Sequence, residues 1–281
     1  MKTTVTLLCE NTAGIPLGIV GEHGFSALIE RGEESILFDT GQGIGLLPNA
    51  AFLGKDLSRV KKVILSHGHY DHTRGLAMLI EKTPTLTVFG HPDIFRERFA
   101  VMEDARGQRH VLPVGLPYTR KDLESKGATF DLSPDFREVA PGLFASGEIP
   151  RPEGWKGGDS RLVVWDGDRY QPDPFRDDLS LVLQTEKGPV ILLGCAHAGL
   201  VLIIRHLRRQ TGFTRFHAIL GGTHLGAADK AEWEEARNLL QECQVENVAT
   251  SHCTGFQANC FLASRLGERV VPASAGTSFE F

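Results

Sequence analysis

The sequence has few cysteines, and they lack the pattern of a disulfide-rich protein. Only five of its 281 residues are cysteine, and no two of them form a Cys-x-x-Cys pair. Secreted domains that depend on disulfides usually carry an even number of cysteines. We therefore expect a reducing compartment, and specifically a cytoplasmic protein. The five are Cys9, Cys195, Cys243, Cys253 and Cys260.

Long apolar runs and an excess of positive charge are also missing. No stretch approaches the roughly 20 apolar residues that a membrane-spanning helix needs, and the first residues lack the shape of a signal peptide. The formal net charge is −5, whereas broad nucleic-acid binding needs a basic surface. We expect neither a membrane nor a nucleic acid as partner, and a small anionic substrate is still compatible with the composition.

What the sequence does have is a dense group of histidines at 66–72, directly after the apolar run 63–65. Alternate side chains of an extended backbone point the same way, so His67 and His69 can converge on one point. As the chain turns, Asp71 and His72 reach a neighbouring point. Imidazole suits zinc, and a carboxylate widens the choice to manganese or iron. Two adjoining ligand pairs predict two metals about 4 Å apart.

Three later segments repeat this design. Each is a predicted strand that ends in small residues followed by a histidine, namely His197, His224 and His252. Ligands gathered from strand ends along one sheet edge are a common way to build a site in layered α/β proteins.

The run His67-x-His69-x-Asp71-His72 after a short strand resembles the signature of the metallo-β-lactamase superfamily. Together with 38–41, 147–151, 194–197, 221–225 and 252–255, it is similar to one branch, the 7,8-dihydropterin-6-ylmethyl-4-(β-D-ribofuranosyl)aminobenzene 5′-phosphate synthase-like proteins. The resemblance implies an α/β fold, a four-layer αββα sandwich. We expect a single domain over 1–281 with a loop-rich insertion around 93–178, which forms either a lid, a substrate wall or a homodimer contact.

The resemblance also implies a ligand set for one or two zinc ions, or for manganese or iron. Its members are His67, His69, Asp71, His72, His197 and His252. Asp39 would orient the metal loop from behind. Cys195 stands where the superfamily has an aspartate that bridges both metals. It either ligates metal or is a small buried residue beside the ligands, and we favour the second interpretation.

The function that this site predicts is hydrolysis by a metal-activated water, on a phosphoester or another small anionic ester. Asp71 and His224 are the candidate catalytic residues, and Arg151 and Glu148 the candidate substrate-binding residues. Two alternatives stay open. One is a synthase that condenses a pterin precursor with an aminobenzene ribotide 5′-phosphate, and the other is a metal-binding sensor without catalysis.

Periodicity and turn residues predict the regular elements. We expect helices at 73–81 and 200–209, and one that a capping box opens at Asp229 and Glu232. Strands are expected at 3–9, 25–30, 35–38, 60–65, 85–89, 179–184, 189–193, 216–220 and 245–250.

Overall fold

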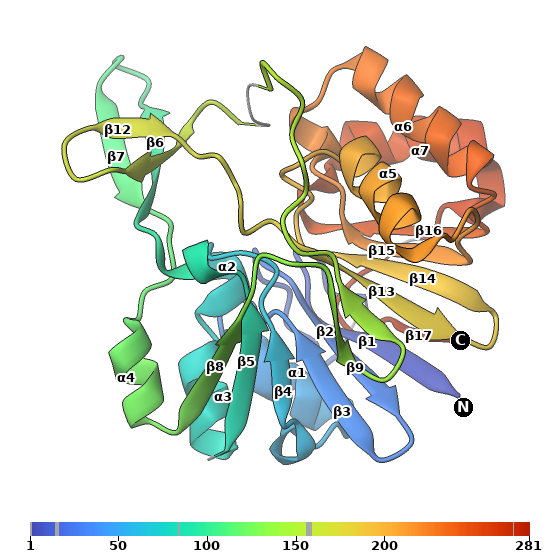
Figure 1. Ribbon diagram of the computed structural model, residues 1–281, viewed down its shortest axis with the longest axis horizontal. Helices are drawn as coiled ribbons and strands as arrows, with labels where there is room; N and C mark the ends of the chain where they lie inside the picture. Colours follow the sequence, from blue (N-terminus) through green and yellow to red (C-terminus); the bar gives the residue numbers. More distant parts are fainter. Residues whose placement is uncertain (1, 15–16, 84, 156–158, 272) are drawn as a thin grey trace.

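Two β-sheets lie face to face and helices cover their outer faces (Figure 1). The computed structural model describes residues 2–14, 17–83, 85–155, 159–271 and 273–281. The four-layer αββα sandwich predicted from the sequence is confirmed. Within the described ranges no helix is both long and apolar enough to cross a membrane.

The first sheet has seven strands in the order β17-β1-β2-β3-β4-β5-β8. Its strands are β1 (Thr3–Cys9), β2 (Ser26–Arg31), β3 (Glu34–Phe38), β4 (Lys62–Ile64), β5 (Leu86–Gly90), β8 (Ala128–Leu132) and β17 (Ser278–Glu280). From β3 to β8 the neighbours are parallel. The carboxyl ends of these four strands therefore meet at one edge of the sheet.

The second sheet has six strands in the order β16-β15-β14-β13-β10-β9. They are β9 (Arg137–Ala140), β10 (Leu143–Ala145), β13 (Ser180–Thr185), β14 (Gly188–Leu193), β15 (Ala218–Gly222) and β16 (Asn247–Ser251). Strands β14, β15 and β16 are parallel, so their carboxyl ends also share an edge.

Alternation of apolar residues explains the layers. In β3, Ile36 and Phe38 belong to the core between the sheets, whereas Leu37 faces the outer cluster with helices α1 (Leu46–Phe52) and α3 (Leu76–Lys82). Strand β14 divides its apolar residues in the same way. Its outer residues pack with α5 (Leu200–Thr211), α6 (Lys230–Glu242) and α7 (Phe256–Leu266). A strand that is buried on both faces has a continuous run of apolar residues in the sequence. Residues 190–193 form such a run.

The segment 93–178 is richer in regular structure than the predicted loop-rich insertion. Its strands β8, β9 and β10 complete the two main sheets. Four others form a separate sheet in the order β12-β11-β6-β7, which projects from the body in Figure 1. These are β6 (Arg98–Glu103), β7 (Arg109–Pro113), β11 (Leu162–Trp165) and β12 (Tyr170–Pro172), and the segment also holds helix α4 (Arg120–Ser125). Residues 156–158 of this segment lie outside the described residues.

The single helix predicted at 73–81 is two short ones. Helix α2 (Tyr70–Thr73) contains His72 itself, and α3 begins at Leu76. A β-carbon on Gly75 would lie 2.1 Å from the carbonyl oxygen of Thr40, so the chain passes too close to the end of the first sheet for a side chain there. No long helix therefore starts directly after His72.

Candidate metal centre

Histidines from both sheets meet where the parallel strands end. His67 follows β4, His197 follows β14, and His252 follows β16. The short segment after β4 supplies four side chains of the site, namely His67, His69, Asp71 and His72. The strand-end arrangement predicted from the sequence is thus present in the fold.

Three buried histidines form a first cluster. Nε2 of His67 lies 3.0 Å from Nδ1 of His69 and 3.3 Å from Nε2 of His197. The three nitrogens all lie within 4.8 Å of one another, the spacing of ligands around one ion. His69 and His197 are 6% and 3% exposed, and His67 is fully buried. Phe175 stacks on His197 with the ring centroids 4.2 Å apart, which fixes the orientation of that imidazole.

Asp71, His72 and His252 form a second cluster beside the first. Nε2 of His252 lies 3.2 Å from Nε2 of His72 and 3.3 Å from Oδ2 of Asp71. Oδ2 of Asp71 is 3.7 Å from Nε2 of His72 and 3.4 Å from Nε2 of the exposed His23. Burial raises the pKa of the Asp71 carboxyl, but His72 and His252 outweigh that effect and hold its pKa well below the usual value. Asp71 therefore offers a charged oxygen ligand.

Cys195 lies between the two clusters. Its Sγ is 3.1 Å from Nε2 of His72 and belongs to one ligand group with His67 and His72 and to another with His252 and Cys253. A residue that only supported the ligands would sit behind them. The thiol instead faces the ligand atoms, so the geometry favours a ligand position over the supporting role expected from the sequence.

Hydrogen bonds behind the site fix the imidazoles. Asp39 is fully buried and its Oδ2 lies 2.7 Å from Nδ1 of His72 and 2.7 Å from the Ser66 hydroxyl that donates to it. Ser66 Oγ in turn lies 2.8 Å from Nδ1 of His67. A β-carbon on Gly194 would approach Ser66 Oγ to 2.2 Å, so only glycine lets the strand end close over this pair. Asp39 lies behind the metal loop, where the sequence placed it.

These hydrogen bonds assign the tautomers. His72 donates from Nδ1 to Asp39, His67 donates from Nδ1 to Ser66, and His252 donates from Nδ1 to Oδ1 of Asn11 at 2.9 Å. Each Nε2 is then left with a lone pair that points into the site. Carboxylate or amide partners on the outer nitrogen are typical of metal-binding histidines.

The first cluster fits a metal because its three imidazoles are held in the neutral form, which can bind a cation. Burial lowers the pKa of His67 and His197 well below the ordinary histidine value, and burial with a smaller effect of Arg98 lowers the pKa of His69 to about 3. Nε2 of His69 and Nδ1 of His197 are buried without a hydrogen-bond partner. Converging lone pairs repel one another unless a cation lies between them, and imidazole and carboxylate are ligands for zinc, manganese and iron.

The second cluster should bind metal with release of a proton. Burial pulls the pKa of His72 down, but Asp71 and Asp39 outweigh it and raise the pKa to about 9. His72 must lose this proton before Nε2 can ligate, so we expect affinity to rise at least about tenfold per pH unit from pH 7 to pH 9. Burial also raises the pKa of the Cys195 thiol, so the proton from His72 is measured on the Cys195→Ser apo-protein. Calorimetric titration of that variant in buffers with different ionisation enthalpies should show about one proton released at pH 7. Binding without proton release would contradict this.

The three remaining predicted site residues differ in position. His224 has its ring centroid 4.5 Å from that of His197, and both its ring nitrogens are buried and unpartnered, but it belongs to neither ligand cluster. Arg151 donates to the carbonyl oxygens of Ile149 and Phe175 and stacks over Trp155. Glu148 lies 3.8 Å from Nε2 of His91 and 3.9 Å from Nε of Arg176, and neither ligand cluster contains it.

A buried ion triad behind the metal loop was not predicted. The Arg98 guanidinium is 1% exposed and binds Asp173 at 2.8 Å and Asp177 at 2.6 Å. The second carboxylate oxygen of Asp177 accepts from the backbone N–H of Gly68 at 2.8 Å, between two ligands. Asp178 similarly accepts from the N–H of Ala198, beside His197, at 2.7 Å. The sequence feature that could have indicated these contacts is the pair Asp177 and Asp178, which lies just before the buried strand β13.

Comparisons with known proteins agree with this geometry. A model of the metallo-β-lactamase superfamily matches residues 19–252. The 7,8-dihydropterin-6-methyl-4-(β-D-ribofuranosyl)-aminobenzene-5′-phosphate synthase of Methanocaldococcus jannaschii is 32% identical over 98% of this chain and 95% of its own. The crystal structure of Tm1679, a metal-dependent hydrolase of the β-lactamase superfamily, superposes with a TM-score of 0.84 at 25% identity, covering 99% of both chains.

A more distant structure shares the fold alone. Zn²⁺-bound PqqB from Methylobacterium extorquens superposes with a TM-score of 0.57 at 15% identity, over 98% of this chain and 99% of its own. The superfamily match covers the metal loop, the second sheet, the first sheet except β1 and β17, and the last ligand, His252. The chain belongs to the metallo-β-lactamase superfamily.

Proposed function

We propose that this protein is a metal-dependent hydrolase that acts on a phosphoester or a related small anionic ester. The observation that carries the proposal is the pair of adjoining ligand clusters, in which buried imidazole nitrogens and the charged carboxylate of Asp71 converge on two neighbouring points. When bound, one or two zinc ions would lower the pKa of water toward about 7 and polarise the ester bond.

The side chains around the clusters have separate tasks in this proposal. His67, His69 and His197 would hold one ion. Asp71, His72 and His252, whose ligand atoms lie 3.2 to 3.7 Å from one another, would hold the other. His224 is placed to move a proton, because its ring lies beside His197 and both its nitrogens are free of protein partners. Burial lowers the pKa of His224, but the neighbouring Cys253 and, to a smaller extent, Asp178 outweigh it and raise the pKa above its ordinary value. An imidazole in this position is suited to general acid–base catalysis.

Metal removal and a panel of esters test this function. Treatment with a chelator should abolish turnover of p-nitrophenyl phosphate, bis-p-nitrophenyl phosphate or a lactone, and zinc or manganese should restore it. Activity that survives complete removal of metal would contradict the proposal. Full metal content without turnover of any ester would favour the sensor.

Cys195 is proposed as a thiolate ligand in place of the bridging aspartate. Its Sγ faces ligand atoms of both clusters, and thiolate binds zinc and cobalt well. The cobalt-substituted protein should show a near-ultraviolet thiolate-to-metal charge-transfer band that Cys195→Ser removes. Cys260→Ser, at an exposed cysteine, is the matched control and should keep the band. If Cys253→Ser and not Cys195→Ser removes it, the neighbouring thiol is the ligand.

A synthase is the second candidate, and the full-length similarity to the M. jannaschii enzyme is what favours it. That relative matches 98% of this chain, so the insertion and the site are both included in the similarity. Incubation with a pterin diphosphate and an aminobenzene ribotide 5′-phosphate, followed by mass analysis of the product, separates the candidates. A condensed product would make the synthase the function, and hydrolysis products alone would exclude it.

A further inference from the structure

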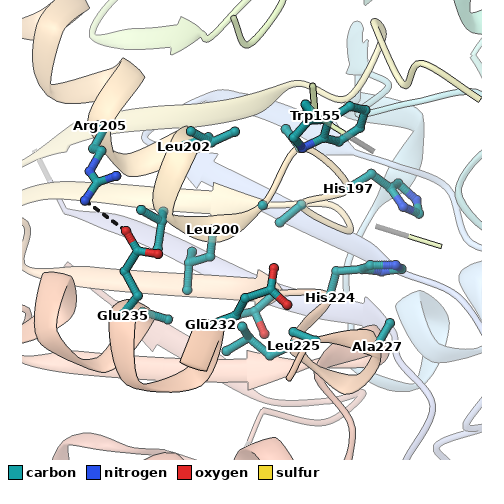
Figure 2. A pocket seen from close by; sticks show the side chains of 17 residues that line it. Trp155, His197, Leu200, Leu202, Arg205, His224, Leu225, Ala227, Glu232 and Glu235 are labelled. Carbon is teal, nitrogen blue, oxygen red and sulfur yellow. Dashed lines mark ion pairs between the residues drawn. The ribbon is translucent and has the colours of Figure 1, made fainter. Parts of the chain in front are cut away.

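A cavity of about 250 Å³ opens beside the first cluster and runs between helices α5 and α6. Figure 2 shows His197 and His224 at one end of it and the ion pair of Arg205 and Glu235 at the other. His197 belongs to both the cavity wall and the three-histidine cluster. A part of the substrate that is bound in this cavity would therefore lie next to the bond that reacts at the metal cluster.

The inner walls of the cavity are apolar and small. Leu200 and Leu225 line it and are 2% and 5% exposed, and the indole of Trp155 covers one side. The small wall residues are Ala196, Ala198, Gly199, Ala227, Ala228 and Ala236. Such walls offer few hydrogen bonds, so they would bind a group by burial of apolar surface.

Size and shape narrow the class of group. An apolar cavity of about 150 Å³ is enough to hold benzene, and ligand pockets for larger molecules start at about 300 Å³. The present volume of about 250 Å³ lies between these limits. It has room for one ring with its substituents.

The outer end of the cavity is acidic. Glu232 and Glu235 line it with a single guanidinium, Arg205, whose Nη2 is 3.0 Å from Glu235. Glu232 has no arginine or lysine within ion-pair distance in the described part of the chain, and it closes the capping box of α6 by accepting from the Asp229 N–H. The formal charge of this end is negative, which disfavours a carboxylate or phosphate on the distal part of the bound group.

We propose that this cavity binds a neutral or cationic single-ring aryl group of the substrate, so that the ester bond lies at the metal cluster and the ring between α5 and α6. The choice of an aryl ester rests on the hydrolase function proposed above. The proposal of an aryl-binding site does not rest on that function, because the binding of a ligand to it can be measured without turnover. Leu200, Leu225 and Trp155 would then determine specificity.

Ligand-detected NMR with aniline tests the site directly. Ala227→Trp places an indole at the mouth of the cavity from an exposed position, and we expect it to weaken aniline binding at least about tenfold, the loss expected when one ring is no longer buried. Ala231→Trp is the matched control, since Ala231 is exposed on α6 and does not line the cavity. It should bind aniline as the unmodified protein does. Benzoate should bind at least about tenfold more weakly than aniline.

The outcomes separate the site from the reaction. Aniline binding that Ala227→Trp removes supports the aryl site even if no ester is turned over. Absence of aniline binding, or equal binding by both tryptophan variants, would overturn it even if esters are hydrolysed. Tighter binding of benzoate than of aniline would overturn the assignment of a neutral or cationic group. Phenyl and methyl esters of the same acid then report whether a bound ring raises kcat/KM.

Discussion

His67→Ala should reduce turnover of any ester substrate by at least about 10³-fold. Metal ions supply several kcal/mol of transition-state stabilisation in such sites, and each 1.4 kcal/mol corresponds to about a factor of ten in rate. His67 acts on both clusters, because it belongs to one ligand group with His69 and His197 and to another with His72 and Cys195. Its loss should weaken both clusters. Steady-state kinetics with metal added to saturation measures the effect.

The same substitution at an exposed histidine provides the control. His110 has a half-exposed side chain on β7 paired with Asp104, and neither ligand cluster contains it. His110→Ala should leave kcat and metal content unchanged. Circular dichroism of both variants checks that the fold is intact. A His67→Ala protein that folds and retains more than about a tenth of the activity would exclude this histidine from the metal centre.

Arg98→Met should lower the free energy of unfolding by about 3–5 kcal/mol, since it leaves Asp173 and Asp177 buried without a counter-charge. For a domain of this size that corresponds to a melting temperature lower by about 6–15 °C. Both carboxylates are at most 1% exposed in their side chains, so water cannot compensate them. Asp177 also holds the N–H of Gly68, and metal affinity should fall with it. Thermal melts of the chelated protein measure the stability alone.

Arg59→Met is the matched control for this loss. Arg59 forms an exposed pair with Glu33, whose side chain is 99% exposed, and pairs of that kind contribute about 0–1 kcal/mol. Arg98→Lys keeps the charge but not the planar fork that contacts two carboxylates, so it should recover part of the stability. Equal melting temperatures for Arg98→Met and Arg59→Met would show that the triad is not a stabilising element.

The metal loop could be predicted because its information is local. His67, His69, Asp71 and His72 lie within six residues after a strand, and alternation in an extended chain suffices to predict two ligand points. The helix capping box at Asp229 and Glu232 is equally local, and the structure confirms it. The four-layer fold was an expectation from the resemblance that these motifs carry, and the structure confirms it.

The missed features depend on residues far apart in the sequence. Arg98 meets its two aspartates across 75 and 79 residues, and no local pattern marks that pairing. Strands β8, β9 and β10 lie in a turn-rich segment, and only their partners in the main sheets define them. The break between α2 and α3 has the same origin, because the close approach of Gly75 to Thr40 exists only in the folded chain.

Metal content per chain tests the central claim, two adjoining sites, most directly. Elemental analysis after equilibrium dialysis against zinc should give about two ions for the unmodified protein. His197→Ala should leave about one ion, held by Asp71, His72 and His252. His252→Ala should leave about one ion, held by His67, His69 and His197 together with Cys195. One ion in the unmodified protein that both variants lose would mean a single site. It would contradict the assignment of two clusters.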